Sequence, residues 1–176
     1  ISDTVLRFAV FKGREWRLLA SRLPPGVVKG GKVVAHADLV SHLIKLKSQI
    51  PGHDSPSRII SVVIVLGSLN VYTQVVSLPT LEESKLDEAV KLNLQMVAPS
   101  AAADVYSGWQ IVGEDKNEKK LDILSAFLDR SVVEDFSKAL REAGFLPVAL
   151  ESRAMAMARV VRERGIGIDK QRSYVV

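Results

Sequence analysis

Few residues of this chain have the types and the spacing that metal binding or covalent catalysis requires. The histidines are His36, His42 and His53. His36 and His42 are six positions apart, whereas two ligands on one helix face are about three or four positions apart. A metal site is therefore not expected. Because the sequence has no cysteine, disulfides, thiolate zinc sites, iron–sulfur clusters and a cysteine nucleophile are excluded.

The other chemically suggestive motifs have simpler explanations. Gly67-Ser68-Leu69 lacks the second glycine of a nucleophile elbow, so it predicts a turn between strands. The acidic pairs Asp87–Glu88 and Glu134–Asp135 fall in predicted helices, where they favour the helix N-terminus through the macrodipole. Neither a phosphate-binding P-loop nor a dinucleotide glycine fingerprint is present. The residues alone favour a binding or assembly module over an enzyme.

The composition is that of an ordinary globular protein. Of 176 residues, 47% are hydrophobic and 25% are charged, which excludes intrinsic disorder. The net charge of +4 divides into +6 for residues 1–80, −5 for 81–150 and +3 for 151–176. Aromatic residues make up only 6%, and a nucleic-acid binder usually interleaves them with a basic stripe, so nucleic acid is not an expected partner. The apolar run 62–66 is far shorter than the roughly 20 residues that span a bilayer.

Hydrophobic periodicity predicts elements in the order ββ-α-β-β-α-ββ-α-β-α-β. Strands are expected at 4–11, 15–21, 59–66, 71–78, 105–112, 121–128, 145–150 and 173–176. The segment 59–66 is almost continuously apolar, which is typical of a strand that is covered on both faces. Capping boxes at Thr80 and Ser131, and an N-cap at Ser152, predict three helix starts.

The order of elements predicts an α/β chain with an insertion. Residues 71–150 have the pattern β-α-β-β-α-β, which is typical of a compact two-layer α+β unit with helices on one sheet face. Residues 1–70 and 151–176 then form a partial α/β subdomain around it. No internal repeat is found.

Several segments together resemble the type IV pilus assembly proteins of the PilM family. They are Leu23-Pro24-Pro25-Gly26-Val27-Val28, Gly31-Lys32-Val33-Val34, 75–79, Ala98-Pro99, Tyr106, 109–112, 143–148 and Glu151-Ser152-Arg153-Ala154, in the order of the family. The resemblance implies an actin-like, ribonuclease H-like fold with a small inserted subdomain, similar to the cell-division protein FtsA. The expected fold class is therefore a partial actin-like domain with an inserted β-α-β-β-α-β subdomain.

The resemblance also implies a function. It indicates a cytoplasmic scaffold at the inner face of the inner membrane, which binds the N-terminal cytoplasmic tail of a PilN-like protein in a groove near the insertion and contacts other pilus-assembly proteins. Alternatives that share the fold are an ATP-binding protein of the FtsA-like kind and a type II secretion protein of the GspL-like kind.

A nucleotide site is implied only in a degenerate form. The family's first phosphate motif runs from an aspartate through a Gly/Ser-rich turn to a lysine, and Ser2, Asp3, Thr4 and Arg7 occupy that region here. The glycine is missing, and Arg7 stands where lysine is usual. Because a nucleotide needs both halves of the actin-like cleft, we expect no cofactor and no enzymatic activity for this chain, and ATP with Mg²⁺ only for a full-length parent.

Overall fold

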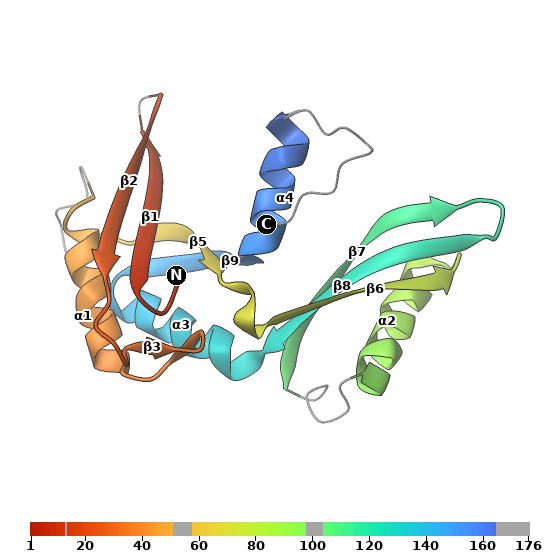
Figure 1. Cartoon of the computed structure of the whole chain (residues 1–176), viewed down its shortest axis with the longest axis horizontal. Helices are drawn as coiled ribbons and strands as arrows, with labels where there is room; N and C mark the ends of the chain where they lie inside the picture. The colour runs from red at the N-terminus through yellow and green to blue at the C-terminus, as the bar shows by residue number, and fades with distance from the viewer. Residues whose placement is uncertain (13, 51–57, 98–103, 165–176) are drawn as a thin grey trace. The chain divides into compact units, whose positions relative to one another are not determined.

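The computed structural model describes residues 1–12, 14–50, 58–97 and 104–164. The chain folds into two compact units (Figure 1). Ile1–Leu69 and Glu134–Val176 form the first, here called the outer unit, and Asn70–Val133 form the second, here called the inserted unit. The predicted strand 173–176, His53 and Ala98-Pro99 lie outside the described residues.

The outer unit begins with an antiparallel hairpin. Strands β1 (Val5–Lys12) and β2 (Glu15–Arg22) pair along their whole length, as the alternating apolar residues predict. A short ribbon follows, made of β3 (Val28–Lys29) and β4 (Lys32–Val33). Helix α1 (His36–Lys47) then presents Leu39, Leu43 and Leu46 to the core.

The outer unit is completed by a parallel strand pair. Strand β5 (Ile60–Leu66) pairs with β9 (Phe145–Ser152), which helix α4 (Arg153–Arg164) follows. The register shifts between Val62 and Val63, where β9 places Pro147 opposite Val62. Proline has no N–H to donate to a ladder, so a local irregularity is expected there.

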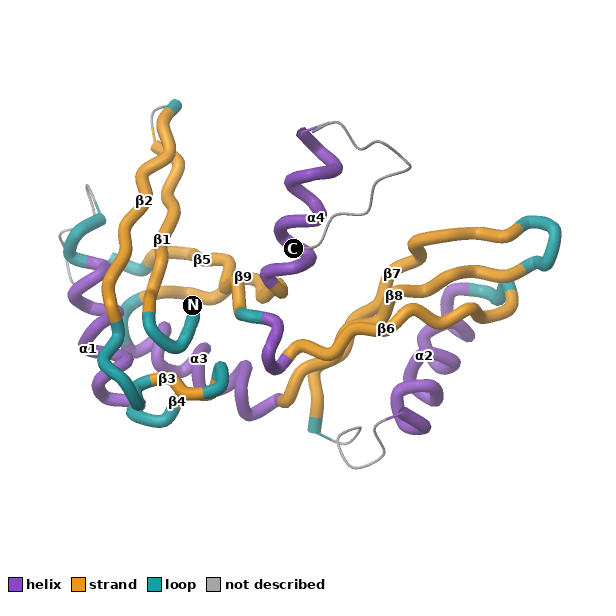
Figure 2. The backbone as a smooth tube through the Cα atoms, in the orientation of Figure 1, coloured by secondary structure: helices purple, strands orange, loops and turns teal. Residues whose placement is uncertain are grey.

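Over its described residues, 70–97 and 104–133, the inserted unit is a three-stranded antiparallel sheet with one helix on one face (Figures 1 and 2). The strands are β6 (Val71–Pro79), β7 (Val105–Asp115) and β8 (Lys120–Asp129), in the spatial order β6-β8-β7. The 3₁₀ turn η1 (Ser68–Asn70) precedes β6. Helix α2 (Glu83–Val97) packs Leu86 and Val90 against Leu121 and Ile123 of β8.

The predicted end of the insertion at residue 150 is wrong. The strand expected at 145–150 belongs to the outer unit because it pairs with β5, and the inserted unit ends at Val133. Helix α3 (Arg130–Glu142) continues from one unit into the other. The inserted unit is therefore β-α-β-β, and the pattern β-α-β-β-α-β is corrected by the loss of its last helix and strand.

Of the predicted helix starts, the one at Ser152 is confirmed and the one at Ser131 is wrong. The N-cap at Ser152 is confirmed, because its Oγ accepts a hydrogen bond from the Met155 N–H at 3.2 Å. Helix α3 begins at Arg130, so Ser131 lies inside the helix and the capping box expected there is wrong. The apolar stripe of α3 is nevertheless as expected, with Val132, Phe136 and Leu140 buried.

Candidate functional site

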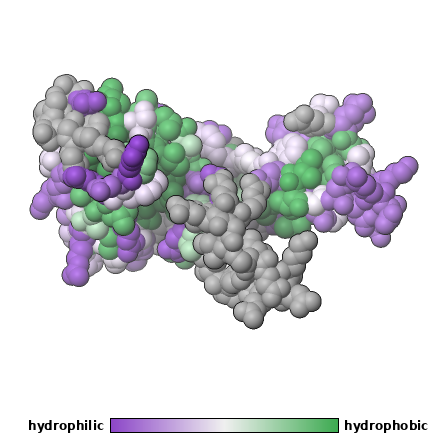
Figure 3. Space-filling view, turned by 90° about the horizontal axis from the view of Figure 1, so that it is seen from above, coloured by the Kyte–Doolittle hydropathy of each residue, from purple (hydrophilic) through white to green (hydrophobic). Residues whose placement is uncertain are grey.

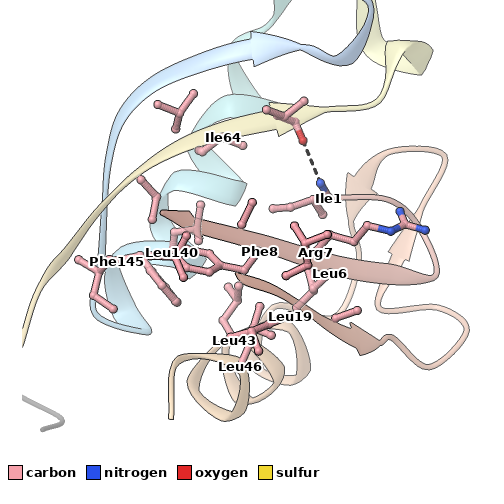
Figure 4. A pocket seen from close by; sticks show the side chains of 18 of the residues that line it. Ile1, Leu6, Arg7, Phe8, Leu19, Leu43, Leu46, Ile64, Leu140 and Phe145 are labelled. Carbon is pink, nitrogen blue, oxygen red and sulfur yellow. Dashed lines mark hydrogen bonds between the residues drawn. The ribbon is translucent and has the colours of Figure 1, made fainter. Parts of the chain in front are cut away.

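An apolar cavity of about 800 Å³ lies in the outer unit between β1 and β5 (Figure 4). Residues 6–11 of β1 and residues 60–65 of β5 line it without a gap. Successive side chains of a strand point to opposite faces of a sheet, so an uninterrupted series of lining residues means that each strand presents its edge. We call this cavity the slot.

The edge of β1 that faces the slot carries a defined set of backbone groups. On the other side, the Leu23 N–H donates to the Thr4 carbonyl at 2.8 Å, which continues the ladder with β2. Residues of an antiparallel pair alternate in the direction of their N–H and C=O groups. Arg7, Ala9 and Phe11 therefore direct theirs away from β2, toward the slot.

The edge of β5 that faces the slot also carries a defined set of backbone groups. The Ile60 N–H donates to the Gly144 carbonyl at 3.2 Å, on the side of β9. The Val65 carbonyl accepts a hydrogen bond from the amino group of Ile1 at 2.8 Å, on the side of the slot. By the same alternation, Ser61 and Val63 direct their backbone groups into the slot as well. Within the described residues, β1 pairs only with β2, and β5 only with β9.

The walls of the slot are hydrophobic. Leu43 and Leu46 of α1, Leu140 of α3 and Phe145 of β9 line it and are buried. The rings of Phe8 and Phe145 lie 5.9 Å apart, centre to centre, so β1 contacts the start of β9 at one end of the slot. Figure 4 shows Phe145 and Leu140 at one end of the slot and Ile1 with Arg7 at the other.

At this second end of the slot, the positive charges of Arg7 and Arg153 affect the pKa of the Ile1 amino group. Burial lowers the pKa of the Ile1 amino group below its ordinary value of 8.0, and the charges of Arg7 and Arg153 lower it further. An uncharged hydrogen-bond donor in the position of this amino group would keep the bond to Val65 and avoid this repulsion.

The predicted phosphate-site residues take different positions. Both carboxylate oxygens of Asp3 accept backbone hydrogen bonds, from Gly30 at 2.7 Å and Gly31 at 2.8 Å. These glycines have φ values of +57° and +73°, which lets successive amides converge on one anion. Ser2 Oγ donates to the Val5 carbonyl at 3.1 Å. Phosphate binding by this segment stays a prediction.

Thr4 and Arg7, the other two residues of the predicted phosphate site, lie apart from the turn that contains Ser2 and Asp3. The Thr4 side chain is exposed and its carbonyl belongs to the ladder with β2. Arg7 is exposed on β1 and lines the slot. The structure therefore brings Ser2 and Asp3 into one turn and places Arg7 at the mouth of an apolar cavity.

Outside the slot, the part of the chain that the structure describes offers few groups that could bind a metal ion or catalyse a reaction. His36 Nε2 pairs with Glu142 Oε2 at 2.9 Å, which connects α1 to α3. Across the described ranges, no group of three or more histidine and acidic side chains could hold a metal ion. None of the helices in those ranges is long and apolar enough to cross a membrane.

Sequence reasoning missed the slot, although one signal pointed to it. The segment 59–66 is almost continuously apolar, as expected of a central strand. Among the strands that the structure describes, β5 has a neighbour on one edge only, and Val63 is 56% exposed. The strand therefore has the composition of a central strand, while one of its edges lines the slot.

Comparison with known proteins establishes the fold. No family model matches the chain, and no curated protein matches it in sequence. A solved structure described as the PilM-PilN type IV pilus biogenesis complex is similar over 93% of this chain and 49% of that chain, with a TM-score of 0.77 and 21% identity. The cytoplasmic domain of EpsL, an inner membrane component of the type II secretion system of Vibrio cholerae, is similar over 84% of this chain and 52% of that chain, with a TM-score of 0.52 and 13% identity.

The chain thus spans about half the length of each of these proteins. The predicted α/β class is confirmed, because this chain shares its fold with the matched half of the first of them, and the corrected insertion is Asn70–Val133. At these identities the likeness is one of fold.

Proposed function

We propose that this chain is part of a PilM-like cytoplasmic scaffold of type IV pilus assembly, which binds the N-terminal tail of a PilN-like inner-membrane protein. The observation that carries the proposal is the match to the PilM-PilN complex over 93% of the chain at a TM-score of 0.77. A match over so much of the chain includes residues of both units. Through its partner, the protein would be held at the cytoplasmic face of the inner membrane.

The described residues favour binding over catalysis. They form an apolar slot that is bounded by strand edges. Open strand edges and hydrophobic surfaces are the features by which domains capture extended or helical peptide tails. Contacts with other pilus-assembly proteins would add to this scaffold role.

The inserted unit offers hydrophobic surface for such a tail. Figure 3 shows hydrophobic side chains gathered on this unit and hydrophilic ones at the end that carries the β7–β8 turn. Leu92 and Met96, one helical turn apart on α2, are 61% and 81% exposed. On β6, Val75 is 62% exposed. Val75 alternates with Gln74, whose side chain contacts Asn93 of α2, so Val75 belongs to the sheet face opposite the helix.

A peptide titration tests the proposal. A fluorescein-labelled peptide with the N-terminal tail sequence of the PilN-like protein from the same organism is titrated into the full-length protein, with a scrambled peptide as control. Saturable binding of the tail peptide alone is expected. The variants L92S/M96S and V75S then distinguish the outer side of α2 from the open sheet face, because each removes exposed apolar atoms without opening the core. If the full-length protein binds neither peptide, the proposal is wrong.

A second candidate is a type II secretion protein of the EpsL kind, which the fold match at a TM-score of 0.52 supports. The same titration with the cytoplasmic tail peptides of type II secretion inner-membrane proteins distinguishes the two systems. An ATP-binding, FtsA-like parent is the remaining alternative, and it depends on Ser2, Asp3, Thr4 and Arg7. A rise in the melting temperature of the full-length protein with Mg-ATP, abolished in R7A, would favour it.

A further inference from the structure

The two faces of the β1–β2 hairpin have different surroundings. Residues that lie opposite each other in an antiparallel ladder point to the same face, so the register of the hairpin defines both faces. One face contacts the rest of the outer unit, because it carries the buried Leu6 and also Phe8, whose ring lies 5.9 Å from that of Phe145. The other face, here called the open face, consists of four ladder pairs: Val5 with Arg22, Arg7 with Ala20, Ala9 with Leu18, and Phe11 with Trp16.

The open face presents large apolar side chains to solvent. Phe11, Trp16 and Leu18 are 59%, 63% and 79% exposed, and the rings of Phe11 and Trp16 lie 5.2 Å apart, centre to centre. These three residues are among those that line the slot, but at such exposures they border it from its open side. In Figure 1 the hairpin extends away from α1, β5 and β9. A group of exposed apolar side chains of this kind indicates a surface that contacts another molecule.

The charged side chains of the open face are all arginines. Arg7 and Arg22 lie toward the base of the hairpin, and Arg14 follows at the turn, and all three are exposed. Arg14 has a φ of +92°, a backbone conformation that favours glycine, so the geometry of the turn does not explain an arginine there. Glu15, the one acidic residue of the hairpin, alternates with Trp16 and so belongs to the other face. The apolar centre of the open face is therefore flanked by positive charge at both ends.

We propose that the open face of the hairpin binds the surface of an anionic lipid bilayer. Aromatic rings such as that of Trp16 are favoured at the boundary between the acyl chains and the headgroups. Arginines beside them are attracted to the negative surface and donate hydrogen bonds to lipid phosphates. An element with one apolar face and basic flanks lies in the plane of the interface. The contact needs no protein partner, so the inference is independent of the proposed scaffold function.

The arrangement favours a bilayer over a nucleic acid. Single-stranded nucleic acids stack their bases on aromatic rings that are separately accessible, whereas Phe11 and Trp16 cover part of each other. Leu18 and the alanines of the open face add apolar surface that a phosphate backbone does not match. A bilayer offers acyl chains and phosphate groups along the whole face at once.

Flotation of the full-length protein with lipid vesicles tests this inference. Vesicles of phosphatidylcholine and phosphatidylglycerol in equal amounts should bind the protein, and vesicles of phosphatidylcholine alone should bind it much more weakly. The variants F11S/W16S and R14E/R22E change exposed side chains, and each should lower the association constant at least about tenfold. The fluorescence of Trp16, taken as the difference between the wild-type protein and W16F, should shift to shorter wavelength when the anionic vesicles are added.

The control is K116E/K119E in the turn between β7 and β8 of the inserted unit. It changes the net charge by the same amount as R14E/R22E, also at exposed positions, and should bind the anionic vesicles as the wild-type protein does. Equal losses in these two variants overturn the inference, because binding would then follow net charge alone. Failure of the wild-type protein to bind the anionic vesicles overturns it as well, and so does a Trp16 emission that they leave unchanged. Binding of single-stranded RNA without binding of vesicles would assign the open face to nucleic acid instead.

Discussion

The indole N–H of Trp109 donates a hydrogen bond to Asp87 Oδ1 at 3.1 Å, and this bond connects strand β7 to helix α2 across the core of the inserted unit. The other carboxylate oxygen, Oδ2, pairs with Lys91 Nζ at 2.6 Å, one helical turn along α2. Trp109 also packs against the Leu86 and Ile123 cluster. One carboxylate thus joins the helix to the sheet, although it is not part of the buried core.

Replacing Trp109 by phenylalanine should loosen α2. The ring still fills part of the space, but the donor to Asp87 is lost. We expect faster amide exchange in α2 than in the wild-type protein, with a smaller change in K91Q, because exposed ion pairs contribute little to stability. Equal effects of the two substitutions would contradict a special role for the indole bond. Exchange measured by NMR on both variants gives the comparison.

The same carboxylate predicts a dependence on acid. Hydrogen bonds from Lys91 and Trp109 lower the pKa of Asp87 below its ordinary value of 3.8. Its contribution to stability is therefore complete above pH 3.8 and is lost as the pH falls through the lower pKa of the folded state. NMR titration of the Asp87 carboxyl carbon measures that pKa, and W109F should move it upward.

The amino group of Ile1 predicts a change in the same direction, but at a higher pH. Burial and the charges of Arg7 and Arg153 lower its pKa, so the unfolded chain binds more protons than the folded chain between that lowered value and 8.0. The stability of a chain prepared with Ile1 as its first residue should rise as the pH increases through this window. Acetylation removes the charge and should remove this part of the pH dependence. Urea unfolding of both forms at several pH values makes the test, and parallel pH profiles would contradict the prediction.

Two isoleucines that are paired across the ladder allow the truncation of a buried side chain to be compared with that of an exposed one. Ile123 on β8 and Ile111 on β7 are opposite each other in the ladder, with 0% and 50% of their surface exposed. Ile123→Ala should lower the free energy of unfolding of the inserted unit by about 2–5 kcal/mol. Ile111→Ala removes the same atoms and should cost less than about 1 kcal/mol. Urea unfolding followed by tryptophan fluorescence in a W16F background, where Trp109 is the remaining tryptophan, measures both.

At Gly144 a side chain would meet both backbone strain and the end of the Lys47 side chain, which would have to move. The φ of Gly144 is +81°, and a Cβ there would collide with Lys47 Nζ. Gly26 has a φ of +92° but has open space around its missing Cβ. Gly26→Ala should therefore cost about 1–2 kcal/mol from backbone strain alone, and Gly144→Ala should cost more. Thermal unfolding of the two variants separates strain from collision, and equal melting temperatures would contradict the collision.

Local features of the fold follow from the sequence because their signals are local. The alternation of apolar residues predicts the β1–β2 hairpin, and Ser152 predicts the start of α4. Pairing between distant segments leaves no such signal. Nothing near Phe145 indicates that β9 pairs in parallel with β5 rather than with the neighbouring strands, so the insertion was predicted to be too long.

The candidate site was harder to predict for the same reason. The backbone amides that hold Asp3 come from Gly30 and Gly31, in a different turn. The slot is lined by the edges of β1 and β5, and which strand edges stay unpaired depends on pairing between distant segments. Only the continuous apolar composition of 59–66, typical of a central strand, carried that information in the sequence.

The parallel pairing of β5 with β9 also imposes an order on folding during synthesis. Ile60 leaves the ribosome before the whole inserted unit, yet its partner Phe145 follows that unit. The inserted unit has only antiparallel contacts between its own strands, so it can fold first. Val71 at its start pairs with Leu128 near its end, which brings the flanking segments together and shortens the loop that β5 and β9 must close. Folding of the inserted unit thus lowers the entropic cost of pairing β5 with β9 in the outer unit.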